Sequence, residues 1–128
     1  MSYSAEWANV SNTPFRLYKH YIHEGGISTP LIAFWPDGIQ QPSRSVDQIG
    51  HIIDITPPCV EVVGAAYPNE YKGEKIKPME GQSLVPVFHN ESFSHKPIGW
   101  EHEGSRGFRE GKWKLVATVR GRNGNYTI

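Results

Sequence analysis

The glycine pair Gly25–Gly26 is the feature that most restricts how this chain can fold. Glycine has no Cβ, so the backbone can turn sharply at this pair or come very close to a ligand. A lysine, two histidines and a carboxylate stand just before the pair, namely Lys19, His20, His23 and Glu24. A cation so near a tight turn can be aimed at an anion, and the segment therefore predicts an anion-binding turn.

The composition fits a compact protein of one domain. A chain of 128 residues buries on the order of two-thirds of its unfolded surface. Basic and acidic residues both number 13, so the formal net charge is zero and no basic excess supports a nucleic-acid partner. No apolar run approaches the roughly 20 residues that span a bilayer, so no membrane partner is expected. The first residues carry no signal-peptide pattern, which leaves the compartment open.

The first half of the chain predicts short elements separated by turns. The spacing of Tyr18, Tyr21 and Ile22 fits one helical turn, or a loop with a short turn of helix. Residues 30–36 form an apolar run bounded by prolines, which predicts a buried strand in a parallel or mixed sheet. These signals alone do not fix which elements pack together.

Helical signals follow in residues 43–64. Ser45 with Gln48 resembles a capping box, and apolar residues then repeat at helical spacing, at positions 46, 49, 52 and 53. Thr56–Pro57 predicts a second helix start and Gly64 its end. We therefore expect two short helices, or one helix broken at Thr56, before a turn-rich connector over residues 65–95.

Residues 96–128 carry the pattern of antiparallel strands. Along the segment 112–119, Trp113, Leu115 and Ala117 alternate with their neighbours as on the covered face of a half-buried strand. Asn123–Gly124 is a strong hairpin-turn signal. The strand that this turn introduces has barely begun when the sequence stops, so we expect a truncated protein.

Seven segments along the chain are each weak as family motifs, but their order makes the set specific. They are residues 7–16, 19–26, 30–36, 50–58, 79–84, 100–104 and 111–116. In this order they resemble the C-terminal third of sulfatases of the arylsulfatase type, although Pro58 departs from the usual Pro-Thr. The resemblance implies an α/β fold of the alkaline-phosphatase-like class. Residues 1–95 would end the large domain, and residues 96–128 would open the small antiparallel C-terminal domain.

The resemblance implies that Lys19 binds the sulfate of a sulfate ester and is the one catalytic residue in this chain. The family uses a formylglycine, made from a Cys/Ser-x-Pro-x-Arg motif, and a calcium ion. Cys59, the single cysteine, is followed by Val60 and Glu61 and fails the motif, while Asn12 has the spacing but cannot be oxidised. The calcium ligands would lie N-terminal to Met1, so we expect neither metal nor cofactor in this chain.

The polar residues of the glycine segment allow more than one role. Glu24, Gly25 and Gly26 are expected to shape the turn that positions Lys19, and a direct substrate contact by Glu24 is the less favoured alternative. His20 and His23 line the substrate site, where imidazoles serve as acids or bases, or they pack as loop histidines.

His102 is expected at the rim of the cleft. Together with Glu101 and Glu103 it also suggests a metal site, but alternation along a strand would place both carboxylates on the face opposite the histidine. A structural role is expected for His51. The core is expected to include Trp35, Trp100, Trp113 and Cys59.

The parent enzyme would hydrolyse a sulfate ester, and this chain alone is expected to be inactive. The alternative is a non-catalytic module that binds sulfate or a sulfated glycan through Lys19. A third hypothesis is association with a missing N-terminal portion, or oligomerisation, through a sheet edge and an apolar face exposed around residues 31–34.

Overall fold

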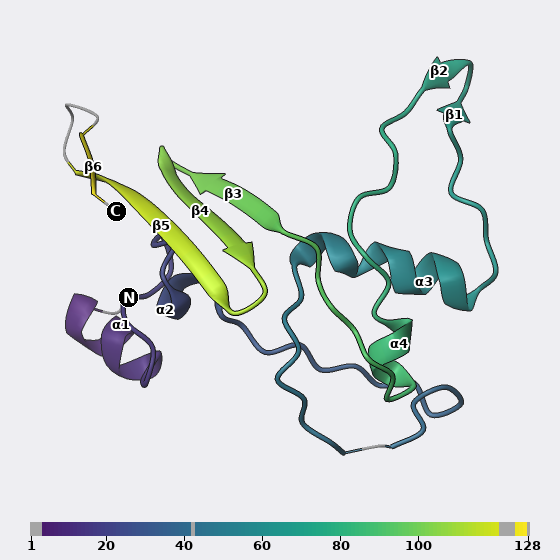
Figure 1. Cartoon of the computed structure of the whole chain (residues 1–128), viewed down its shortest axis with the longest axis horizontal. Helices are drawn as coiled ribbons and strands as arrows, with labels where there is room; N and C mark the ends of the chain where they lie inside the picture. The colour runs from purple at the N-terminus through teal and green to yellow at the C-terminus, as the bar shows by residue number, and fades with distance from the viewer. Residues whose placement is uncertain (1–3, 42, 121–124, 128) are drawn as a thin grey trace. The chain divides into compact units, whose positions relative to one another are not determined.

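A computed structural model of the chain describes residues 4–41, 43–120 and 125–127 (Figure 1). The chain divides into two compact units, each with its own internal contacts. One unit joins the first 32 residues to residues 96–128, and the other comprises residues 33–95. The predicted domain boundary between residues 95 and 96 stays a prediction.

The sheet of the first unit is antiparallel throughout. Strands β3 (Ile98–His102), β4 (Ser105–Glu110), β5 (Trp113–Arg120) and β6 (Asn125–Thr127) lie in the order β3-β4-β5-β6. The first three follow one another as green to yellow arrows in Figure 1. The predicted antiparallel strands are therefore confirmed, whereas the turn signal Asn123–Gly124 lies outside the described residues.

The face of β5 that is covered differs from the prediction. Trp113 is 73% exposed and Leu115 is 55% exposed, while the Lys114 side chain is only 13% exposed. The ammonium of Lys114 lies 5.6 Å from the ring centroid of Trp100 and bonds to Glu24. An ion pair and an aromatic face thus hold the lysine side of the strand inward, and the prediction that Trp113 is in the core was wrong.

Trp100 packs across the neighbouring strand, where Gly107 is its partner in register. A Cβ on Gly107 would lie 2.4 Å from the indole ring, so only glycine leaves room for it. This packing leaves Trp100 half-buried, so the predicted core position of Trp100 is partly realised in the first unit.

The N-terminal segment of this unit contains two short helices, α1 (Ala5–Ser11) and α2 (Glu24–Ile27). The helical turn predicted around Tyr18 instead begins at Glu24, because the chain bends irregularly before the glycine pair. Ile22 is 2% exposed and is the most deeply buried apolar residue in the described part of the chain. The loop before α2 is therefore anchored from within.

The second unit holds the remaining elements: a 3₁₀ helix η1 (Ile52–Asp54), α3 (Thr56–Val62), β1 (Glu70–Tyr71), β2 (Glu74–Lys75) and α4 (Val85–Phe88). Strands β1 and β2 pair as a short antiparallel ribbon. Helix α3 begins at the predicted Thr56, with Pro57 and Pro58 buried in its first turn. Within the described residues, no helix has the length and apolar character needed to cross a membrane.

Two predicted elements are absent from the described residues. Residues 30–36 contain no strand, and Ile32 and Phe34 are 90% and 89% exposed. A strand needs a neighbour for its hydrogen bonds, and no described strand pairs with this run. Residues 44–50 are not helical either, because the capping box that forms joins His51 to Asp54 and starts only the short η1.

Cys59 lies on the exposed side of α3, which corrects its predicted burial. Its thiol donates a hydrogen bond to the Ile55 carbonyl oxygen over 3.2 Å. The buried side of the helix start is formed by the prolines instead, which explains why a cysteine among valines does not reach the core.

Asp54 is the polar centre of the second unit and is fully buried. Its carboxylate accepts hydrogen bonds from the backbone N–H of His51 at 2.6 Å and of Gln82 at 2.8 Å. The His95 Nε2 atom lies 2.8 Å from the same carboxylate. One side chain therefore ties together three segments that are far apart in the sequence, because a buried carboxylate must satisfy its oxygens.

Replacing Asp54 with alanine should destabilise the second unit by about 1–3 kcal/mol, because it removes the hydrogen bonds that link a buried carboxylate to two backbone N–H groups and to His95. Urea unfolding followed by tryptophan fluorescence measures the change through Trp35, which lies in this unit. Asp47 is exposed, so Asp47→Ala is the matched control and should unfold like the parent. Equal midpoints for both variants would contradict the role given to Asp54.

Candidate functional site

The glycine pair lies close to the backbone of the loop that precedes it. A Cβ on Gly25 would lie 1.9 Å from the Leu17 carbonyl oxygen, and one on Gly26 would lie 1.9 Å from that of Tyr21. The Gly25 N–H donates to the Arg16 carbonyl oxygen over 3.0 Å. Both glycines are required here because backbone atoms fill the space that a side chain would need.

Glu24 ties this turn to the sheet. Its carboxylate accepts a hydrogen bond from the Lys114 ammonium at 2.7 Å, and the Arg109 guanidinium lies 3.4 Å away. Lys114 comes from β5 and Arg109 from β4. The carboxylate that the sequence singles out thus faces two cations of the sheet, and this contact fixes where the residues before it lie.

A pocket of about 300 Å³ opens beside the turn. It is lined by Lys19, His20, Tyr21, Ile22, Gly26, Ile27, Trp100 and His102. The structure therefore brings His102 to the same cavity as Lys19 and His20, although it lies far from them in the sequence. Trp100 and Ile27 supply an apolar wall that sequence reasoning did not assign to the site, since their apolar character indicates only burial.

His23 is placed differently from the other two histidines. It is half-buried, and its Nδ1 atom is buried without a hydrogen-bond partner among the described residues. Burial lowers the pKa of His23 below its ordinary value, and the nearby charges of Arg16 and Lys114 lower it further. His23 is not among the residues that line the pocket, and both roles left open for it stay predictions.

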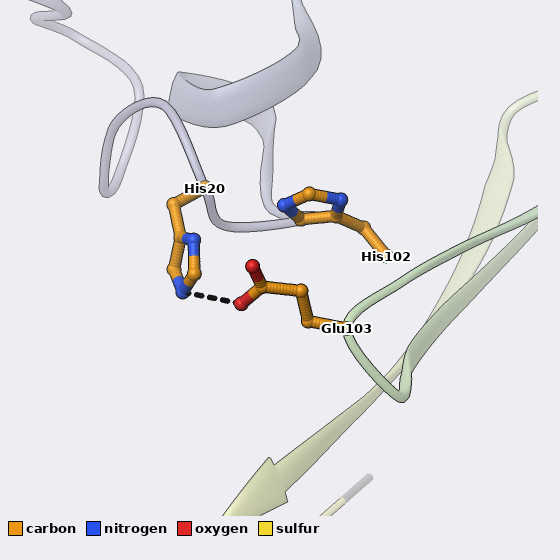
Figure 2. A group of neighbouring side chains, drawn as sticks. All are labelled: His20, His102 and Glu103. Carbon is orange, nitrogen blue, oxygen red and sulfur yellow. Dashed lines mark ion pairs between the residues drawn. The ribbon is translucent and has the colours of Figure 1, made fainter.

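Two of the residues that line the pocket, His20 and His102, converge with Glu103, as Figure 2 shows. The Nε2 atom of His20 lies 3.2 Å from a carboxylate oxygen of Glu103, and the His20 and His102 rings have centroids 5.5 Å apart. One ligand atom from each of the three residues lies within 4.8 Å of the others. All three side chains are exposed, so the cluster is open to solvent.

The expected alternation of this segment stops where β3 ends. The last residue of the strand is His102, and Glu103 lies in the following turn with a φ of +50°. The Glu101 carboxylate accepts a hydrogen bond from the Gly104 N–H, whereas Glu103 extends toward His20 (Figure 2). Because Glu103 lies beyond the strand, its carboxylate is not held on the face opposite His102.

This cluster does not suit the calcium ion of sulfatases. Calcium prefers six to eight oxygen ligands, and two of the three groups here offer imidazole nitrogen. Within the described residues no other set of three such side chains converges.

Comparison with known proteins identifies the relatives of the chain. No family model matches the sequence. An uncharacterized sulfatase of Schizosaccharomyces pombe is 30% identical over 118 residues, which cover 89% of this chain and 21% of that protein. A sulfatase of Formosa agariphila is 37% identical over 83 residues, which cover 65% of this chain and 14% of that protein.

The chain resembles the C-terminal part of a sulfatase. The N-acetylgalactosamine-6-sulfatase of the dog agrees with this, with 31% identity over 88 residues that cover 69% of this chain and 16% of the enzyme. The chain thus spans about one fifth or less of the length of these relatives. The resemblance stated from the residues alone is confirmed, and the short helices and antiparallel sheets agree with a sulfatase C-terminal region.

Replacing Gly26 with alanine should destabilise the first unit by about 1–3 kcal/mol, because the Tyr21 carbonyl oxygen must move to admit the methyl group. Thermal unfolding measured by circular dichroism reports the change. Gly99, on β3, is the matched control because the nearest atoms to a Cβ there lie 3.7 Å away. Gly99→Ala should leave the midpoint close to that of the parent, and a similar loss in both variants would contradict the close approach at Gly26.

Proposed function

We propose that this chain forms the C-terminal part of an arylsulfatase-like sulfuric ester hydrolase of the alkaline-phosphatase-like class. In this proposal Lys19 supplies a cation to the sulfate site. The observation that carries it is the position of Lys19 on the pocket beside the glycine turn, together with His20 and His102. The sulfatase relatives support the class of reaction.

The electrostatics of Lys19 suit an anionic ligand. Among the described residues, no carboxylate forms an ion pair with its ammonium group, whereas Glu24 is engaged by Lys114 and Arg109. A fixed ammonium stabilises the negative charge that develops on a sulfate as its S–O bond breaks. The turn that Glu24 and the glycines form would hold Lys19 in place for that role.

The sulfatase reaction also needs a nucleophile and a metal. The resemblance assigns these to a formylglycine and a calcium ion, and the residues after Cys59 do not fit the formylglycine motif. In this proposal the isolated chain is therefore inactive, and the remaining groups come from other parts of a sulfatase. The sulfate ester substrate would meet Lys19 only in the complete active site.

A second candidate function is a non-catalytic module that binds sulfate or a sulfated glycan. The observation in its favour is that all residues lining the pocket belong to one unit of this chain. A pocket that is complete within one unit can bind an anion without catalysis. Aromatic and histidine side chains on its wall would suit a sugar ring.

Calorimetry with sulfate and with an aryl sulfate tests Lys19. Lys19→Ala should weaken binding by about tenfold or more, because a charge-assisted hydrogen bond contributes about 1.5–3 kcal/mol. Lys77 is exposed and belongs to the other unit, so Lys77→Ala is the matched control and should bind like the parent. Absence of saturable binding would remove the binding module, and binding unchanged in Lys19→Ala would remove the role of Lys19.

Measuring hydrolysis of the aryl sulfate in the same samples tests whether the chain is an active enzyme by itself. Both proposed functions predict that it is not. The purified chain should show no turnover. Clear turnover that disappears in Lys19→Ala would overturn the proposal that the nucleophile is supplied from elsewhere.

We further propose that the exposed apolar segment around Ile32 is an association surface, either for the remainder of a sulfatase or for a second copy of the chain. Leu31, Ile32 and Phe34 are 60%, 90% and 89% exposed. Large apolar side chains exposed within one short segment are a common feature of protein interaction sites.

Light scattering should therefore show self-association of the parent chain that Ile32→Lys reduces. Val63 lies outside this segment, at the C-terminal end of α3, and is 74% exposed. Val63→Lys therefore serves as the control. A stable monomer at all concentrations would contradict the surface as an oligomer contact.

A further inference from the structure

The cluster of His20, His102 and Glu103 has the composition of a metal site with an open position. Two imidazoles and one carboxylate are a ligand set that zinc uses when it keeps a fourth position for water or substrate. The three donor atoms lie within 4.8 Å of one another. We propose that these residues bind a divalent transition-metal ion of the zinc type beside the pocket, which His20 and His102 also line.

The distances fit this proposal with small side-chain movements. Zinc lies about 2.0–2.1 Å from nitrogen and carboxylate ligands, so tetrahedral ligands are about 3.3 Å apart. The His20 Nε2 atom and the Glu103 oxygen already lie 3.2 Å apart. His102 must approach, and since all three side chains are exposed, rotation about their own bonds can bring it in.

The hairpin turn presents Glu103 to His20. Glu103 and Gly104 are the two residues between β3 and β4, and both have positive φ, +50° and +82°, as a tight hairpin turn requires. The Glu103 carboxylate and the His20 ring then meet head to head (Figure 2).

The donor types select the class of metal. Imidazole nitrogen suits zinc, copper and nickel, and a single carboxylate does not supply the many oxygens that calcium or magnesium require. His20 and His102 also line the pocket with Lys19, so an open coordination position would face the same cavity. A bound metal ion would add a second positive charge beside Lys19, and this inference stands whether or not the chain belongs to an active sulfatase.

Titration of the whole chain with zinc chloride, followed by calorimetry, tests the site. The parent should bind one equivalent, and His102→Ala and Glu103→Gln should each weaken binding by tenfold or more, since even supporting residues of metal sites cost about 10–100-fold. The matched controls are His89→Ala, a half-buried histidine of the other unit, and Glu110→Gln, an exposed carboxylate of the same hairpin. Both controls should bind like the parent.

Imidazole-nitrogen NMR of the parent chain gives a second measurement that needs no variant. Zinc should shift the ring resonances of His20 and His102 and leave that of His89 unchanged. The proposal is overturned if the parent binds no stoichiometric zinc. It is equally overturned if the two ligand variants bind as tightly as the controls, or if zinc shifts all histidines alike. Because zinc alone is the probe, these outcomes are separate from the sulfate-binding test of Lys19.

Discussion

The contact between Glu24 and Lys114 is the interaction on which the site depends. The two charged atoms lie 2.7 Å apart, and the lysine side chain is only 13% exposed. An ion pair with a largely covered partner is less screened by solvent than a surface pair, and loss of the carboxylate would leave a covered ammonium without its partner. The pair also decides which face of β5 turns inward, since it draws Lys114 across Trp100.

Around this contact, two turns bring the chemistry together. The glycine pair allows the first segment to fold tightly enough for Glu24 to reach the sheet, and the turn after β3 delivers Glu103 to His20. The pocket between these turns carries a cation on one side and an apolar wall on another. This combination is the reason we propose an anionic ligand for the pocket and a metal ion beside it.

The second unit depends on a different constraint, the burial of Asp54. Its carboxylate joins η1 to the loop at Gln82 and to His95, in the same unit as the buried apolar residues Leu84 and Val85. Few apolar residues are buried in the described chain, and several large ones are exposed. Polar contacts between loops, such as those of Asp54, add to this small core, and local patterns in a sequence do not reveal them.

The sequence alone determined the antiparallel strands after residue 96, the start of α3 at Thr56 and the need for glycine beside Lys19, because these follow from local periodicity and local sterics. It also carried the resemblance to sulfatases. Only the tertiary structure decided which face of β5 is covered and that residues 30–36 form no strand, because both depend on distant partners. It alone brought His20 to Glu103, since the two residues are 83 positions apart and no local signal couples them.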